Sequence, residues 1–178
     1  MATEPSTKAL PESDSHFVPH IQGLRALAVL LVVVYHFWPN RLTGGYIGVD
    51  VFFVISGFLM TGIITRGLEH GNFSLWSFYL ARAMRILPAL IVLCAILLAA
   101  GWWFLPSPEY LMLGTHSAFS LAFLSNIKFW LEAGYFDAAS HEKWLLHTWS
   151  LSVEWQFYLL LPLVLMLAWK LHPKLSTL

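Results

Sequence analysis

Charge and cysteine are scarce in this sequence. Of its 178 residues, 11% are charged and one, Cys94, is a cysteine, whereas charged residues make up about 25% of a soluble domain. The formal net charge is zero, so the basic surface that nucleic acid requires is missing, and we expect no nucleic-acid partner. A single cysteine excludes an intrachain disulfide and a cysteine-based metal cluster, and we expect no metal site.

Apolar side chains, by contrast, make up 58% of the chain, and the mean hydropathy is +0.66. This composition is typical of a membrane protein. The first 18 residues differ, because they are polar and lack the basic start and the short apolar stretch of a signal peptide. We therefore expect a polar cytoplasmic tail over residues 1–18 and one membrane domain over residues 19–178.

A membrane-spanning helix needs about 20 mostly apolar residues. Stretches 21–38, 48–65, 83–105 and 148–169 meet this requirement clearly. The stretch 111–131 is too polar to face lipid, and we expect it to be a weak or re-entrant segment. The sequence thus predicts an all-α, polytopic transmembrane bundle in the cell membrane.

Orientation follows from the tendency of cytoplasmic loops to carry Lys and Arg. With the N-terminus inside and 111–131 not crossing, seven Lys and Arg residues lie inside and three lie outside. The inner set is Lys8, Arg25, Arg66, Arg82, Arg85, Lys170 and Lys174, and the outer set is Arg41, Lys128 and Lys143. If 111–131 crossed, the ratio would be six to four, so the first arrangement is preferred.

Ionisable residues within the first two expected spans are candidates for function, because such groups are costly in lipid. Arg25 and His36 are eleven residues apart, which on a helix is three turns plus about 20°, so they share one face roughly 16 Å apart. The structural alternative is a snorkelling arginine and a hydrogen-bonded core histidine. Asp50 and Ser56 also have structural alternatives to a functional role. Asp50 would be a carboxylate at a helix N-terminus, and Ser56 would be a small residue that allows close helix packing.

Arg82 and Arg85 are three residues apart, on one face, at the expected cytoplasmic start of the third span. Two guanidinium groups suit a phosphate, and a helix N-terminus would add to the attraction. The alternative is that they only satisfy the preference for positive charge inside.

The segment HTWSLSVEWQFY, residues 147–158, places His147, Ser150 and Glu154 at spacings that share a helical face. Glu154 lies within a span and needs a partner to stay charged there, so it is the hardest to explain structurally. The aromatic residues of the segment, Trp149, Trp155 and Tyr158, suit an interfacial belt. We also expect most histidines outside these motifs to be interfacial.

Four blocks, in this order, resemble the acyltransferase-3 family of multi-pass membrane O-acyltransferases: Arg25 with His36, then GYIGVDVFFVISGFL, FYLARAMRILP and LLHTWSLSVEWQFYLLLPL. The resemblance implies transfer of an acyl group, by default acetyl, from acyl-CoA to a hydroxyl of a cell-surface carbohydrate. It implies no tightly bound cofactor, with acyl-CoA as the donor substrate.

The resemblance also implies site residues. Arg25 with His36 would be the family's arginine-histidine motif, His36 being essential, and Arg82 with Arg85 its acyl-donor pair. Asp50 and Glu154 would join His36 as catalytic residues. The acceptor-side or supporting residues would be His147, Trp149, Ser150 and Ser56. The family's domain has about ten spans, so we expect this chain to be its N-terminal portion, needing the remainder of the domain or a partner chain.

Combining these points, we expect His36 to act as general base, with Glu154 or Asp50 orienting its ring. A transient acyl-histidine is an open alternative. CoA would lie against Arg82 and Arg85 with help from Arg25. Two rival functions also remain open: a transporter or proton-conducting protein in which the same groups line a path, and an inactive truncated remnant. The identity of the acceptor is open as well.

Overall fold

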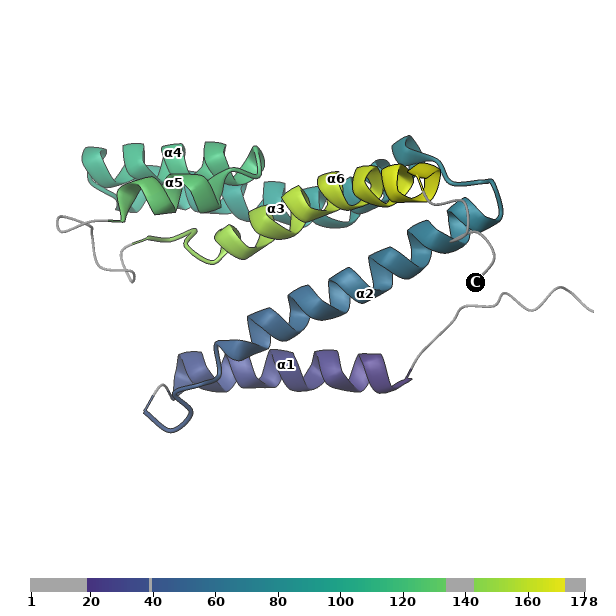
Figure 1. The fold of residues 1–178 in the computed structure, drawn as a ribbon. Helices are drawn as coiled ribbons and strands as arrows, with labels where there is room; N and C mark the ends of the chain where they lie inside the picture. The colour runs from purple at the N-terminus through teal and green to yellow at the C-terminus, as the bar shows by residue number, and fades with distance from the viewer. Residues whose placement is uncertain (1–18, 39, 134–142, 172–178) are drawn as a thin grey trace, which may run out of the picture. The chain divides into compact units, whose positions relative to one another are not determined.

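The computed structural model describes residues 19–38, 40–133 and 143–171. These residues form six α-helices and no strand (Figure 1). The helices are α1 (Pro19–Phe37), α2 (Ile47–Glu69), α3 (Leu75–Phe104), α4 (Ser107–Leu121), α5 (Ser125–Glu132) and α6 (Thr148–Leu171). The chain divides into two compact units, Met1–Val51 and Phe52–Leu178, with the boundary inside α2.

Four helices are long and apolar enough to cross a membrane, as the sequence predicts. The qualifying segments are His20–Phe37, Ile47–Glu69, Leu75–Phe104 and Thr148–Leu171. Their outer faces carry exposed apolar side chains such as Leu160 and Leu167 of α6, which is the pattern expected of lipid-facing helices. The all-α, polytopic class is therefore confirmed.

The third span starts eight residues earlier than the sequence predicts, at Leu75 and not at residue 83. Ser74 caps the helix, because its side chain accepts a hydrogen bond from the backbone N–H of Ser77 at 3.4 Å. A hydropathy boundary misses such a start, since the helix continues across Ser77 and Arg82 as long as its backbone hydrogen bonds are made.

In the first unit, glycines allow α1 to approach the start of α2 closely. A Cβ atom at Gly48 would lie 2.4 Å from the carbonyl oxygen of Ala28, and one at Gly45 would lie 2.5 Å from that of Leu31. Both distances are too short for any larger residue, so the two glycines of the GYIG motif serve helix packing.

In the second unit, the helices pack around two apolar clusters. One contains Leu90 and Cys94 of α3 with Leu113 of α4. The other joins Met60 and Ile64 of α2 to residues of α3 and α6. These clusters fix α2, α3 and α6 side by side, and they hold the site described below.

The stretch 111–131 forms two short antiparallel helices rather than one span. The chain reverses at Phe123, whose φ of 55° is in the left-handed region; its buried ring stacks on Trp155 with 4.6 Å between ring centroids. At 15 and 8 residues, α4 and α5 are about 22 Å and 12 Å long, short of the roughly 30 Å hydrocarbon core. The α4 helix packs against α3 and the α5 helix packs against α6 (Figure 1), and this short hairpin is the form expected of a re-entrant segment.

Candidate functional site

Glu154 lies at the centre of a hydrogen-bonded group between α2 and α6. Its Oε1 accepts a hydrogen bond from Ser56 Oγ of α2 at 2.6 Å and another from Tyr158 Oη, one helical turn further along α6, at 2.5 Å. Ser56 and Glu154 are half-buried and Tyr158 is buried. The carboxylate that the sequence marks as hard to accommodate thus has two hydroxyl donors, which replace part of its hydration.

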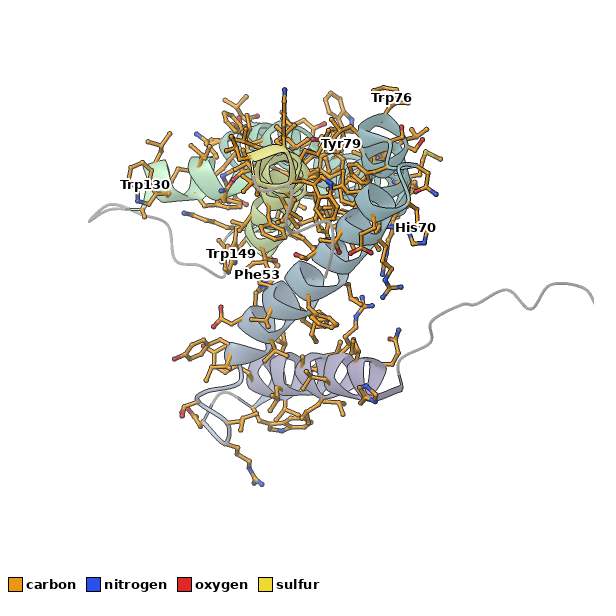
Figure 2. The ribbon with its side chains drawn as sticks, turned by 45° about the vertical axis from the view of Figure 1, so that its right-hand side comes forward. Phe53, His70, Trp76, Tyr79, Trp130 and Trp149 are labelled. Atoms are coloured by element: carbon orange, nitrogen blue, oxygen red, sulfur yellow. The ribbon has the colours of Figure 1, made fainter. Side chains whose placement is uncertain are left out.

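A small cavity opens beside this group. It has a volume of about 200 Å³ and is lined by Phe53, Ser56, Val153, Glu154 and Phe157. Its walls are therefore apolar except for one hydroxyl and one carboxylate. Trp149 extends the aromatic surface, with its ring edge-on to Phe53 at 6.2 Å between centroids, and Figure 2 shows these two side chains close together.

Arg82 faces the same group from α3. It is half-buried, and it lies close enough to Glu154 to interact with the charge of that carboxylate. Its Nε is buried and has no hydrogen-bond partner among the described residues. An unpaired buried donor costs about 1–3 kcal/mol, so an oxygen atom of a ligand would be favourable at this position.

The expected placement of Arg82 and Arg85 at a helix N-terminus is wrong. Because α3 begins at Leu75, Arg82 lies two turns inside the helix, beyond the first turn where the helix dipole acts. Arg85 is exposed. Any attraction of this pair for an anion must come from the guanidinium groups themselves.

Arg25, His36 and Asp50 belong to the first unit. The α1 helix is continuous over Arg25 and His36, so the geometry expected for one shared face holds. His36 is exposed, and its Nδ1 lies 2.8 Å from the carbonyl oxygen of Val32. A carbonyl can only accept, so Nδ1 carries hydrogen and the neutral ring has its lone pair on Nε2. Asp50 is exposed in the first turn of α2.

The expected helical face of His147, Ser150 and Glu154 is correct only in part. His147 lies in the turn before α6, which begins at Thr148. The Ser150 hydroxyl donates to the backbone carbonyl of His147 at 3.1 Å and so serves the start of the helix. Only Ser150 and Glu154 lie on α6 itself.

The expected interfacial belt is also wrong for two of its three members. Tyr158 is 6% exposed and binds Glu154, and Trp155 stacks on Phe123. Trp149 alone is exposed, at 38%. The sequence feature that indicates the contact of Tyr158 with Glu154 is their spacing, because residues four apart on a helix are neighbours.

A second polar group, which the sequence does not reveal, joins α4 to α5. His116 is 2% exposed, not interfacial, and its Nε2 lies 3.0 Å from Glu132 Oε2. Glu132 also pairs with Lys128 at 3.1 Å and with Lys143 at 3.6 Å. Burial raises the pKa of Glu132, but hydrogen bonds from His116 and Lys128 outweigh it and hold the pKa below the ordinary 4.5.

These features define a multi-pass helical membrane protein with a half-buried carboxylate at its candidate site. The acyltransferase domain family matches residues 18–178, and the chain therefore belongs to the acyltransferase-3 family. It is 38% identical over 163 residues to the peptidoglycan O-acetyltransferase OatA of Listeria monocytogenes, covering 89% of this chain and 26% of that protein.

Two further relatives are similar to the chain. A putative O-acetyltransferase of Staphylococcus aureus (strain COL) is 37% identical over 153 residues, which cover 84% of this chain and 25% of that protein. An uncharacterized protein of Haemophilus influenzae is 44% identical over 121 residues, which cover 68% of this chain and 49% of that protein. The chain thus spans between a quarter and a half of the length of these relatives. No solved structure shows significant similarity to it.

Proposed function

We propose that the protein takes part in O-acyl transfer, moving an acyl group, by default acetyl, from acyl-CoA to a hydroxyl of a cell-surface carbohydrate. The observation that carries this proposal is the group of Ser56, Glu154 and Tyr158 in an apolar-walled cavity, with the unpaired Nε of Arg82 near it. Family membership supports the reaction type, and the names of two relatives support acetyl as the group transferred.

The donor would be held by its anionic groups. Arg82 offers a buried N–H donor without a partner among the described residues, and Arg85 adds a second guanidinium group one turn further on. Guanidinium groups bind phosphate oxygens with two parallel hydrogen bonds, which suits the nucleotide end of CoA. Arg25 would assist from the first unit.

The chemical step requires a base for the acceptor. The acceptor oxygen attacks the thioester carbonyl carbon, the C–O bond forms, the C–S bond breaks, and the CoA thiolate leaves. The hydroxyl proton passes to Nε2 of His36, whose lone pair is set by the Nδ1 hydrogen bond to Val32. Asp50 and Glu154 are the candidates for orienting the acceptor or the base.

The membrane placement belongs to the same proposal. We infer the cytoplasmic membrane with the N-terminus inside, which puts the α2–α3 turn on the cytoplasmic side and the α4–α5 hairpin on the outer side. The excess of Lys and Arg in the inner loops supports this placement.

The test is acyl transfer from labelled acetyl-CoA in membranes that contain the protein expressed from its native gene. We expect His36→Ala to lower transfer by roughly 100-fold or more, the loss typical of a general base. Arg82→Gln should weaken acetyl-CoA binding, whereas Arg66→Gln, an exposed arginine at the end of α2, serves as the control. Undiminished transfer by the His36 variant would refute the assigned role. Solute or proton flux that needs no acyl-CoA would favour the transporter alternative.

A further inference from the structure

A second cavity lies between α4 and the turn before α6 in the second unit, and among the described residues it shares no lining residue with the first. It has a volume of about 260 Å³ and is lined by Glu109, Met112, Leu113, His116 and Trp144. This volume is just under the roughly 300–1,000 Å³ of sites that hold drug-sized ligands. It therefore suits one ring of a ligand, not an extended molecule such as CoA.

One wall of this cavity carries a histidine in a fixed tautomer. Nε2 of His116 lies within 3.1 Å of both carboxylate oxygens of Glu132, and a carboxylate only accepts, so Nε2 carries hydrogen. The lone pair of the neutral ring is then on Nδ1. Nδ1 has no hydrogen-bond partner among the described residues, so it is the ring nitrogen available to a ligand.

Glu109 supplies a second acceptor. It is exposed in the first turn of α4, where the helix dipole stabilises a carboxylate. Two acceptors on one cavity select a ligand that donates hydrogen bonds, as hydroxyl groups do. They also disfavour phosphate or another anion, because the carboxylate repels negative charge.

Trp144 completes the site with an apolar platform. Its side chain is 58% exposed and lines the cavity together with Met112 and Leu113, so the cavity combines an aromatic side chain with two polar acceptors. A pyranose ring presents the matching surface, with C–H groups on its faces and hydroxyl groups around its edge. The adjacent end of α3 carries Trp102 and Trp103, which are 70% and 81% exposed and are typical of a membrane–water interface.

We propose that the Glu109–His116–Trp144 cavity binds one neutral sugar ring. This inference rests on the proposed function, because the role of the cavity would be to bind one sugar unit of the acceptor glycan, at a distance from the hydroxyl that reacts. Glu109 and Trp144 are then positioning residues, and they touch neither CoA nor the acyl group.

Fluorine NMR of the purified chain, labelled with fluorotryptophan in detergent micelles, tests the site directly. The Trp144 resonance is assigned from the spectrum of Trp144→Phe. The probes are methyl β-glucopyranoside and methyl N-acetyl-β-glucosaminide, titrated separately. We expect a saturable shift of the Trp144 resonance with at least one probe. If neither probe shifts the Trp144 resonance, the proposal is overturned.

A matched pair of variants tests the carboxylate. Glu109→Gln removes one charged hydrogen-bond acceptor and should weaken glycoside binding by roughly tenfold or more. Glu69→Gln changes an exposed carboxylate at the end of α2 and should leave binding unchanged. Equal affinity of Glu109→Gln and the unchanged chain would overturn the proposal, as would displacement of the glycoside from Trp144 by CoA.

CoA binding and acyl transfer, measured on the same preparations, separate this inference from the proposed function. Glycoside binding without CoA binding or transfer would contradict the proposed function and leave the sugar site standing. Acyl transfer without a shift of the Trp144 resonance by either glycoside would contradict the sugar site alone. In the active protein, Glu109→Gln should raise KM for the glycan with kcat unchanged, because it removes binding that is equal in the ground and transition states.

Discussion

At the residue scale, the contacts of Glu154 separate its structural role from its chemical one. Tyr158 donates to Glu154, and Tyr79 of α3 donates to the backbone carbonyl of Leu159 at 3.0 Å. Each tyrosine thus makes one hydroxyl hydrogen bond to α6. The first touches the site and the second does not, so the two form a matched pair.

We predict that Tyr158→Phe and Tyr79→Phe cost similar stability, about 1 kcal/mol each, because each loses one hydrogen bond. Only Tyr158→Phe should also lower acyl transfer, since Glu154 would lose one of its two hydroxyl donors. Thermal unfolding and transfer rates, measured side by side, check the prediction. Equal loss of transfer in both variants would show that Tyr158 acts through stability alone.

Glu132 gives a pH prediction. Its folded pKa is below the ordinary value of 4.5, so the unfolded chain binds a proton more readily than the folded protein. The stability from its contacts with His116, Lys128 and Lys143 is therefore present above pH 4.5 and is lost as pH falls through the lower, folded pKa.

Thermal unfolding of the chain in detergent at pH 7 and near pH 3 measures this effect. The unchanged protein should lose more of its Tm between the two pH values than Glu132→Gln, which keeps the size of the side chain but cannot ionise. The variant Glu69→Gln, at an exposed carboxylate at the end of α2, is the control, and it should lose as much as the unchanged protein. An identical loss in all three would show that the Glu132 group does not contribute.

At the element scale, Gly48 sets the approach of α1 to the start of α2. A methyl group there would overlap the Ala28 carbonyl oxygen, whereas one at Gly44 would make an ordinary van der Waals contact with Ile47 Cδ1 at 3.8 Å. We predict that Gly48→Ala destabilises the chain by about 1–3 kcal/mol, as overpacking does. Gly44→Ala should have little effect. Unfolding in detergent compares the two, and equal stabilities would contradict the close packing.

The elements show which features hydropathy can predict. Long apolar runs identify four spans correctly, because lipid requires continuous helices of that length. The early start of α3 is capped by the hydroxyl of Ser74, and the residue at the chain reversal, Phe123, stacks on Trp155. Both are local or tertiary contacts that apolar periodicity does not encode.

The sequence predicts part of the candidate site, because charged groups are costly in lipid. Glu154 is identifiable from the sequence because an ionised carboxylate in a span needs partners. Ser56 is identified only as a supporting residue by resemblance, and its hydrogen bond to Glu154 is not predicted. The sequence predicts an interfacial Tyr158, although its spacing from Glu154 indicates contact between the two side chains. The His116–Glu132 group depends on two helices meeting antiparallel, and no spacing along one helix predicts such a meeting.

At the scale of the whole molecule, the α4–α5 hairpin determines how many times the chain crosses the membrane. The hairpin begins at Ser107 and ends at Glu132, and its antiparallel helices return the chain to the side on which it entered. The proposed topology therefore has residues 107 and 133 on the outer side, together with Arg41 in the α1–α2 turn. His70, in the α2–α3 turn, lies inside.

Single cysteines introduced into a Cys94→Ala background test this arrangement in intact cells. We predict that Arg41→Cys, Ser107→Cys and Ala133→Cys react with a membrane-impermeant maleimide from outside, and that His70→Cys reacts only after permeabilisation. Labelling of Ser107→Cys and Ala133→Cys from opposite sides would show that 111–131 crosses, contradicting the hairpin. Reversed labelling of all four would keep the hairpin and overturn the orientation, which would move the proposed sugar site to the cytoplasmic face, away from any cell-surface glycan.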